Sequence, residues 1–228
     1  MKLAFLGTGA AFSLERYNGA VVVDGRVLLD AGAPLLPHMH KLGLDPGAIE
    51  VVFLTHFHGD HLLGLASFLL HRIFVAPTPL LVVGPPGVDK KVEELGALAW
   101  GADWPQLRSQ LQISYQNAVA RGQAAGLTYE SRTLDHGSEG GTGYRLHIGG
   151  RVLVYAGDSE MTSALDALVE GADIAIVEAT GPGPVPSHTS WAEAAGLQAR
   201  HPSTIFMFNH LYSGQLEGAA RDLELVEI

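Results

Sequence analysis

Four side chains that can bind metal ions lie within one six-residue segment, as His56, His58, Asp60 and His61. Imidazole nitrogen and carboxylate oxygen are the ligands that zinc prefers when thiolates are lacking, and the chain contains no cysteine. Three imidazoles and one carboxylate exceed what one tetrahedral ion needs from so short a segment. The segment therefore predicts a two-metal hydrolytic site, in which the ions hold both an attacking oxygen and an oxygen that gains charge.

A strand and a helix are expected to position these four side chains. Ile49–Leu54 is apolar and β-branched, which predicts a buried strand, and His61–Phe74 has apolar residues near helical spacing. His56 and His58 are two residues apart, so in an extended segment they point the same way. Gly59 allows a sharp turn, after which the remaining two candidates face the same space.

Three later residues complete a set of seven candidate metal ligands. They are His136, Asp158 and His210, which follow the predicted strands 127–134, 151–155 and 204–208. Taken singly, each has a plainer interpretation: the two histidines as loop residues, and the aspartate as a cap for the next helix. The shared position just beyond a strand favours one common site.

Glu178 and His188 form a further candidate pair. Glu178 ends the buried run Asp173–Val177, where an unpaired carboxylate would be costly, so a partner is expected. The proline-rich loop over 181–186 leads directly to His188, which can supply that partner. A salt bridge without a catalytic role is the alternative interpretation.

Predicted strands and helices alternate along the chain, which indicates a layered α/β fold. We expect strands over 2–6, 20–24, 26–30, 49–54, 80–83, 127–134, 143–148, 151–155, 173–177 and 204–208, and helices over 34–42, 61–74, 88–100, 161–169, 190–200 and 218–225. Residues 101–126 are amphipathic and favour neither type. Because no linker divides the sequence, we expect a single domain over 1–228.

Charge and composition exclude several classes of protein. The formal net charge of −10 argues against a broad basic surface for nucleic acid or anionic membrane. The N-terminal apolar run is too short for a signal peptide, and no uncharged apolar run reaches the length that spans a membrane. With no cysteine present, we expect a cytoplasmic protein without membrane contact.

The motif His56-x-His58-x-Asp60-His61 matches the signature of the metallo-β-lactamase-fold hydrolases. Further blocks resemble the ribonuclease Z-like, phosphodiesterase branch of that superfamily, in order and over nearly the whole chain. These blocks are Leu6–Gly9, Leu28–Gly32, His136-Gly137, Ala156–Ser159, Glu178–Thr180, His188–Ser190 and Asn209-His210. The resemblance implies a four-layer αβ/βα sandwich.

The resemblance also implies roles for the candidate residues. One zinc ion would be held by His56, His58 and His136, the other by Asp60, His61 and His210, and Asp158 would bridge the two. A hydroxide between the ions would attack the substrate, and Asp60, Glu178 and His188 would act as catalytic residues, the last two in proton transfer to the leaving group. Manganese or iron can also occupy such sites. The resemblance is compatible with a homodimer.

For the substrate, the sequence favours a small phosphodiester, such as a cyclic nucleotide or a short oligonucleotide. The resembling branch also includes ribonuclease Z, a tRNA 3′-endonuclease. However, this acidic chain has no long, basic, glycine-rich insertion, and residues 85–126 are only weakly basic. A hydrolase of another ester class (lactone, thioester or sulfate ester) or a non-hydrolytic metal-binding or sensor protein is also compatible with the sequence.

Overall fold

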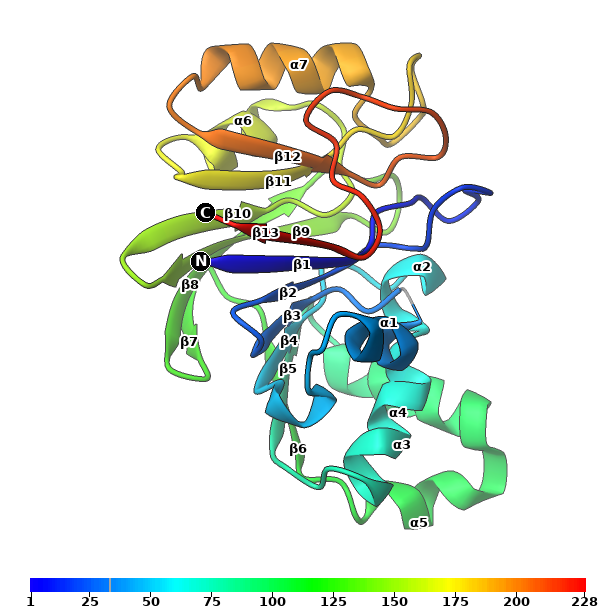
Figure 1. The fold of residues 1–228 in the computed structure, drawn as a ribbon. Coiled ribbons are helices and arrows are strands. Elements are labelled where there is room, and N and C mark those ends of the chain that lie inside the picture. Colours follow the sequence, from blue (N-terminus) through cyan, green and yellow to red (C-terminus); the bar gives the residue numbers. More distant parts are fainter. Residues whose placement is uncertain (33) are drawn as a thin grey trace.

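Two β-sheets pack face to face in the computed structural model, which describes residues 1–32 and 34–228, and helices cover the outer face of each sheet (Figure 1). The layers therefore run helix, sheet, sheet, helix, as the predicted αβ/βα sandwich requires. Both chain termini lie together at one edge, where the N-terminal ammonium donates to the carbonyl oxygen of Ile228 at 2.9 Å.

The first sheet has seven strands in the order β13-β1-β2-β3-β4-β5-β6. Their bounds are Glu224–Glu227, Lys2–Gly7, Ala20–Val23, Val27–Leu29, Val51–Phe53, Leu80–Gly84 and Ile113–Asn117. Strands β3 to β6 are parallel, whereas β1 pairs antiparallel with both β2 and β13.

The second sheet has six strands in the order β12-β11-β10-β9-β8-β7. Their bounds are Ile205–Asn209, Ile174–Glu178, Arg151–Tyr155, Gly141–Ile148, Leu127–Leu134 and Arg121–Ala124. Strands β10, β11 and β12 are parallel to one another, and the others pair antiparallel.

The core has three apolar layers because many strands are buried on both faces. In β1, Leu3 and Phe5 point between the sheets, while Ala4 and Leu6 point toward the helices. The alternation follows from the period of two in a strand. It also explains why these strands are continuous apolar runs in the sequence rather than alternating ones.

The helices divide between the two outer faces. The first sheet is covered by α1 (Leu35–Lys41), α2 (Gly59–Leu62), α3 (Leu65–Phe74), α4 (Val88–Trp100) and α5 (Trp104–Arg108), and the second by α6 (Ser163–Val169) and α7 (Trp191–Arg200). Helix α7 begins with a capping box, in which Ser190 and Glu193 exchange hydrogen bonds.

Two of the predicted helices need correction. The prediction of a helix over 218–225 is wrong: β13 pairs with β1 there, and the carboxylate of Asp222 instead accepts hydrogen bonds from the backbone N–H groups of Thr8 and Tyr17. The predicted helix over 61–74 is divided at Gly64, whose N–H donates to the carbonyl oxygen of Ala31. Each competing contact is long-range, so local sequence could not reveal it.

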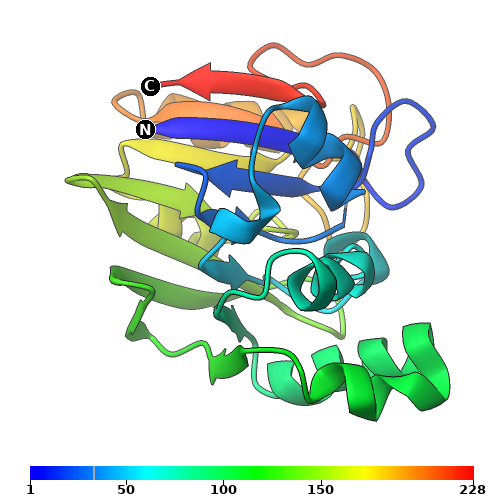
Figure 2. The same ribbon diagram turned by 60° about the horizontal axis from the view of Figure 1, so that its bottom comes forward.

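Residues 101–126, for which the sequence favoured no element, contain α5 and the two edge strands β6 and β7. Figure 2 shows β6 and the β7–β8 hairpin at the lower edge of the two sheets, opposite the edge formed by β13 and β12. Among residues 1–32 and 34–228, no helix is long and apolar enough to cross a membrane.

Candidate metal centre

The first cluster of candidate ligands joins the two sheets. Nδ1 of His58 lies 3.0 Å from Nε2 of His56 and 3.2 Å from Nε2 of His136. Oδ2 of Asp158 lies 3.9 Å from Nε2 of His56 and 3.8 Å from Nε2 of His136. His56 and His58 follow β4 in one sheet, while His136 and Asp158 follow β8 and β10 in the other, so the pairing of the sheets assembles the cluster.

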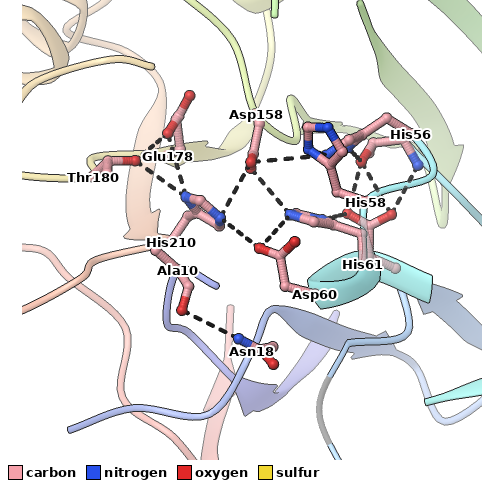
Figure 3. A network of polar contacts seen from close by, with 12 residues as sticks. Ala10, Asn18, His56, His58, Asp60, His61, Asp158, Glu178, Thr180 and His210 are labelled. Atoms are coloured by element: carbon pink, nitrogen blue, oxygen red, sulfur yellow. Dashed lines mark hydrogen bonds and ion pairs between the residues drawn. The ribbon is translucent and has the colours of Figure 1, made fainter. Parts of the chain in front are cut away.

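The second cluster consists of Asp60, His61, Asp158 and His210 (Figure 3). Nε2 of His61 is 3.3 Å from Oδ2 of Asp60 and 3.3 Å from Oδ1 of Asp158. Nε2 of His210 is 3.2 Å from Oδ2 of Asp60 and 3.2 Å from Oδ2 of Asp158. These four side chains, like the three histidines of the first cluster, could hold a metal ion.

The spacing within the second cluster fits a bound zinc ion. Ligand atoms on one tetrahedral zinc ion, with bonds of about 2.0–2.1 Å, lie about 3.3–3.4 Å apart. The distances from His61 and His210 to the two carboxylates, 3.2–3.3 Å, match that separation. In addition, Nε2 of His61 and Oδ1 of Asp158 are buried without a hydrogen-bond partner among the described residues, an arrangement that a shared cation would satisfy.

Hydrogen bonds fix which ring nitrogen of His56 and His61 faces the centre. Nδ1 of His61 donates to Oδ2 of Asp30 at 2.8 Å. The Thr55 hydroxyl donates to the same carboxylate at 2.9 Å, so it can only accept from Nδ1 of His56, 3.0 Å away. Both rings therefore carry their proton on Nδ1 and present the Nε2 lone pair to the centre, as metal-binding histidines do.

Hydrogen bonds to Nδ1 also orient two histidines that follow strands of the second sheet. Nδ1 of His136 donates to the carbonyl oxygen of Ser187 at 2.8 Å. The Thr180 hydroxyl donates to Glu178 and accepts from Nδ1 of His210, 3.1 Å away. Four of the five candidate imidazoles are thus held in the tautomer that a metal ion requires.

Glu178 and His188 pair as the sequence predicted. Oε2 of Glu178, which is fully buried, accepts from Nδ1 of His188 at 2.9 Å, and its Oε1 accepts from the N–H of Ser159 at 2.6 Å. The ring of His188 stacks on that of His210, with centroids 5.3 Å apart, and meets the ring of His136 edge-on at 4.9 Å. The imidazole of His188 therefore lies beside both clusters.

The electrostatics of the centre favour cations. Burial and the neighbouring His61 lower the pKa of His56 to about 2, so that ring is neutral. Burial also acts to lower the pKa of His210, but the charge of Asp158 and hydrogen bonds to Asp60 and Glu178 raise it to about 10. A cation bound to the same carboxylates supplies the positive charge that a second proton on His210 would otherwise carry.

Asp30 is a supporting residue for which no role was predicted. Its fully buried carboxylate accepts from the Tyr155 hydroxyl at 3.0 Å as well as from Thr55 and His61. Both Asp30 and His210 have positive φ, 54° and 57°, a strained conformation that often marks functional sites. The signals in the sequence were the position of Asp30 at the end of a predicted strand and its place in the block Leu28–Gly32.

Comparison with known proteins places this geometry in a family. The family described as "Anti-Pycsar protein Apyc1" matches residues 1–220. The chain belongs to this family. Among curated proteins, ribonuclease Z of Shouchella clausii (strain KSM-K16) is 29% identical over 233 residues, which cover 79% of this chain and 75% of that protein.

Solved structures show that this member of the Apyc1 family has the metallo-β-lactamase fold. The metallo-β-lactamase-fold protein YhfI from Bacillus subtilis superposes with a TM-score of 0.78 at 17% identity, over 99% of each chain. The short form of human tRNase Z gives the same TM-score at 22% identity, over 100% of this chain and 99% of that one. The predicted fold and the predicted ribonuclease Z-like superfamily are confirmed, and the protein is a metal-dependent hydrolase of that superfamily.

Proposed function

We propose that the chain is a dinuclear phosphodiesterase, one domain over 1–228, that hydrolyses a small phosphodiester such as a cyclic nucleotide or a short oligonucleotide. One observation carries the proposal: Asp158 belongs to the second ligand cluster and lies within 3.9 Å of two histidines of the first, and the His188–Glu178 pair lies beside both. Two-metal sites of this kind suit in-line displacement at phosphorus.

Each of the seven candidate ligands has a role in this proposal. His56, His58 and His136 hold one ion, Asp60, His61 and His210 hold the other, and Asp158 bridges them. Histidine and carboxylate ligands suit zinc, and manganese or iron are the competing occupants. When bound, two such ions lower the pKa of a water molecule and offset negative charge on the phosphoryl oxygens.

His188 then assists departure of the leaving group. Glu178 holds its Nδ1, which leaves Nε2 to exchange a proton with the leaving oxygen. The ring is fixed by its contacts with His136 and His210, so it needs little reorganisation during the reaction. Asp60 would contribute as a ligand to the same ion as His61 and His210.

Cleavage of tRNA is the second candidate, because the curated relative is a ribonuclease Z and a solved structure of the same fold is a tRNase Z. The net charge of −10 favours the smaller substrate. Binding to a long RNA normally depends on many contacts between basic side chains and phosphates, which release counterions.

A substrate panel tests the proposal on protein whose metal content has been measured. The panel contains a cyclic nucleotide, a short oligonucleotide, a precursor tRNA, bis-p-nitrophenyl phosphate, p-nitrophenyl sulfate and a lactone. We expect the small phosphodiesters to give the highest kcat/KM. A preference for the sulfate or the lactone would overturn the phosphodiesterase proposal, and the absence of any turnover would favour a metal-binding or sensor protein.

Replacement of His188 separates proton transfer from metal binding. In His188→Asn we expect kcat to fall by about 10²–10⁴-fold, the usual contribution of general acid–base catalysis, while two ions remain bound. The measurements are steady-state kinetics and metal analysis by mass spectrometry. The matched control is His147→Asn, which removes an exposed imidazole that pairs with Glu130 at 3.1 Å. Loss of a metal ion from His188→Asn would show that this residue is a ligand instead.

A further inference from the structure

A cavity of about 340 Å³ opens beside His188. Its walls come from the loop that carries His188 and from the start of the segment leading to α6. Its lining includes Glu160, Met161, Val185, Pro186, His188 and Glu193. A larger cavity of about 700 Å³ lies between residues 15–16 and 214–222, and none of the candidate ligands lines it.

One residue, His188, connects the cavity to the centre. His188 lines the cavity, and its ring also contacts the rings of His136 and His210. A phosphoryl group held at the two clusters would therefore have His188 on one side, and the cavity lies beyond it. The substituent whose oxygen meets His188 would extend into this space.

Size and wall chemistry indicate what the cavity accepts. Its volume is at the lower end of the range for small-molecule pockets, about 300–1,000 Å³, and suits a group of nucleoside size. Met161, Val185 and Pro186 supply apolar surface. The described lining residues include the two carboxylates Glu160 and Glu193 but no lysine or arginine.

The two carboxylates differ in whether they are already held by hydrogen bonds. Glu193 is engaged in the cap of α7, where its Oε2 accepts from the backbone N–H and the hydroxyl of Ser190 at 2.8 and 2.6 Å. Glu160 is exposed to solvent and anchored through its backbone, whose N–H donates to the carbonyl oxygen of Asp135 at 2.7 Å. Glu160 is therefore the side chain that can face an incoming group.

We propose that this cavity is the leaving-group subsite and that the carboxylate of Glu160 excludes leaving groups that carry a further phosphate. The inference rests on the proposed phosphodiesterase function and assigns a specificity-determining residue to it. In the reaction, water adds to phosphorus, the P–O bond to the leaving alcohol breaks, and that oxygen takes up a proton. The alcohol formed in the cavity is then an uncharged sugar hydroxyl.

Dinucleotides with one scissile bond test the exclusion. The substrates are a dinucleoside monophosphate and its two derivatives that carry one extra terminal phosphate on either nucleoside, and product analysis shows which nucleoside leaves. In the parent, we expect kcat/KM for the derivative phosphorylated on the leaving nucleoside to be at least about tenfold lower than kcat/KM for the derivative phosphorylated on the other nucleoside, because like charges at close range repel strongly. In Glu160→Gln the ratio of these two kcat/KM values should fall several-fold toward one.

The control variant is Glu170→Gln, which removes an exposed carboxylate outside the cavity and should keep the parental ratio. An unchanged ratio in Glu160→Gln, or no discrimination in the parent, would overturn the inference even if phosphodiesters are hydrolysed.

Equilibrium binding gives a second readout that does not depend on turnover. By calorimetry, we expect the parent to bind adenosine and Met161→Trp, which fills the cavity, to lose this binding. If no phosphodiester is hydrolysed, the proposed function fails, and adenosine binding still decides whether the cavity accepts an uncharged nucleoside. Equal affinities of the parent and Met161→Trp for adenosine, or no binding to the parent, would refute the subsite.

Discussion

The buried carboxylate of Asp30 holds several of the side chains that support the centre. It accepts hydrogen bonds from the side chains of Thr55, His61 and Tyr155, which come from both sheets. Through Thr55 it also sets the tautomer of His56, and through His61 it acts directly on the second cluster. Asp30 is therefore a positioning residue for both proposed metal ions.

Removal of this negative charge should weaken metal binding while the ligands stay in place. For Asp30→Asn we expect metal affinity to fall by about 10–100-fold, the usual cost of losing an outer-shell partner of a histidine ligand. Titration with a competing chelator measures the affinity. Asp89→Asn on the exposed face of α4 is the matched control. Equal affinities in the two variants would contradict the positioning role.

The candidate ligands were predictable from sequence, whereas their supporting partners were not. His56 to His61 form a compact motif, and each later ligand follows an identifiable strand. Asp30 and Thr180 lie within the blocks Leu28–Gly32 and Glu178–Thr180, but the sequence assigned them no role, because the histidines that they contact are 31 and 30 residues away, respectively. Only the folded arrangement of the sheets brings these partners to the imidazoles.

At the scale of elements, the chain just after β3 passes close to the turn that carries Asp60, at Gly32. A Cβ atom added to Gly32 would lie 1.4 Å from the carbonyl oxygen of Asp60 and 2.9 Å from Cβ of Asn18. No side chain fits there unless the backbone of the turn moves. Gly32 thus allows the strand end, the turn and the loop around Asn18 to pack together.

We expect Gly32→Ala to destabilise the fold by about 3 kcal/mol or more, at the upper end for overpacking, because a backbone atom has to move. Urea unfolding gives the loss in the free energy of unfolding. Gly19→Ala is the control, since an added Cβ there would meet no described atom within 4 Å. Similar stability of the two variants would show that the turn yields easily.

Glu93 joins α4 to its neighbours and should make stability sensitive to acid. Burial acts to raise its pKa, but hydrogen bonds from Arg108, Trp104 and Tyr115 lower it below the ordinary value of 4.5. A carboxyl group with a depressed pKa stabilises the fold above its unfolded-state pKa, and this stabilisation is lost as pH falls through the folded-state value. The sensitive window therefore lies below pH 4.5.

Comparison of Glu93→Gln with the parent checks this dependence. Between neutral pH and about pH 3, the parent should lose more of its free energy of unfolding than the variant does, as measured by urea titration. Glu94→Gln, which removes an exposed partner of Lys90 and Lys91, should behave like the parent. An equal loss in Glu93→Gln and the parent would show that the three hydrogen bonds have no net effect on titration.

The types of the elements could be predicted where a run of residues is continuously buried. The prediction failed where pairing with a distant segment decides the structure. The apolar runs of β1 and β11 and the periodicity of α4 identify these elements without ambiguity. In contrast, β13 alternates between half-buried and exposed residues and is defined by its pairing with β1 at the other end of the chain.

At the scale of the whole molecule, the proposed metal ions cross-link the two sheets. His56, His58 and His61 belong to the half of the chain that contains the first sheet, while His136, Asp158 and His210 follow strands of the second. Ions bound between them stabilise the native state far more than the unfolded state, because the unfolded chain keeps only His56 to His61 close together.

Metal removal should therefore lower global stability. With free metal at about 1,000 times its dissociation constant, the bound ions add about 4 kcal/mol per site to the free energy of unfolding. Urea unfolding with metal, and again with a chelator, measures the difference. Asp158→Asn, which weakens both proposed sites, should show a smaller difference. Coincident unfolding curves for the parent would contradict cross-linking by metal.

The distribution of these ligands along the chain also sets an order for maturation. His210 follows the other six candidate ligands along the chain, so a ribosome has to synthesise residues 1–210 before the second cluster can be complete. Nascent segments that expose His56 to His61 would capture ions only loosely, without the later histidines and Asp158. Loading of the proposed centre thus has to wait until His210 is available, and the supply of metal from that moment would determine how much newly made protein becomes active.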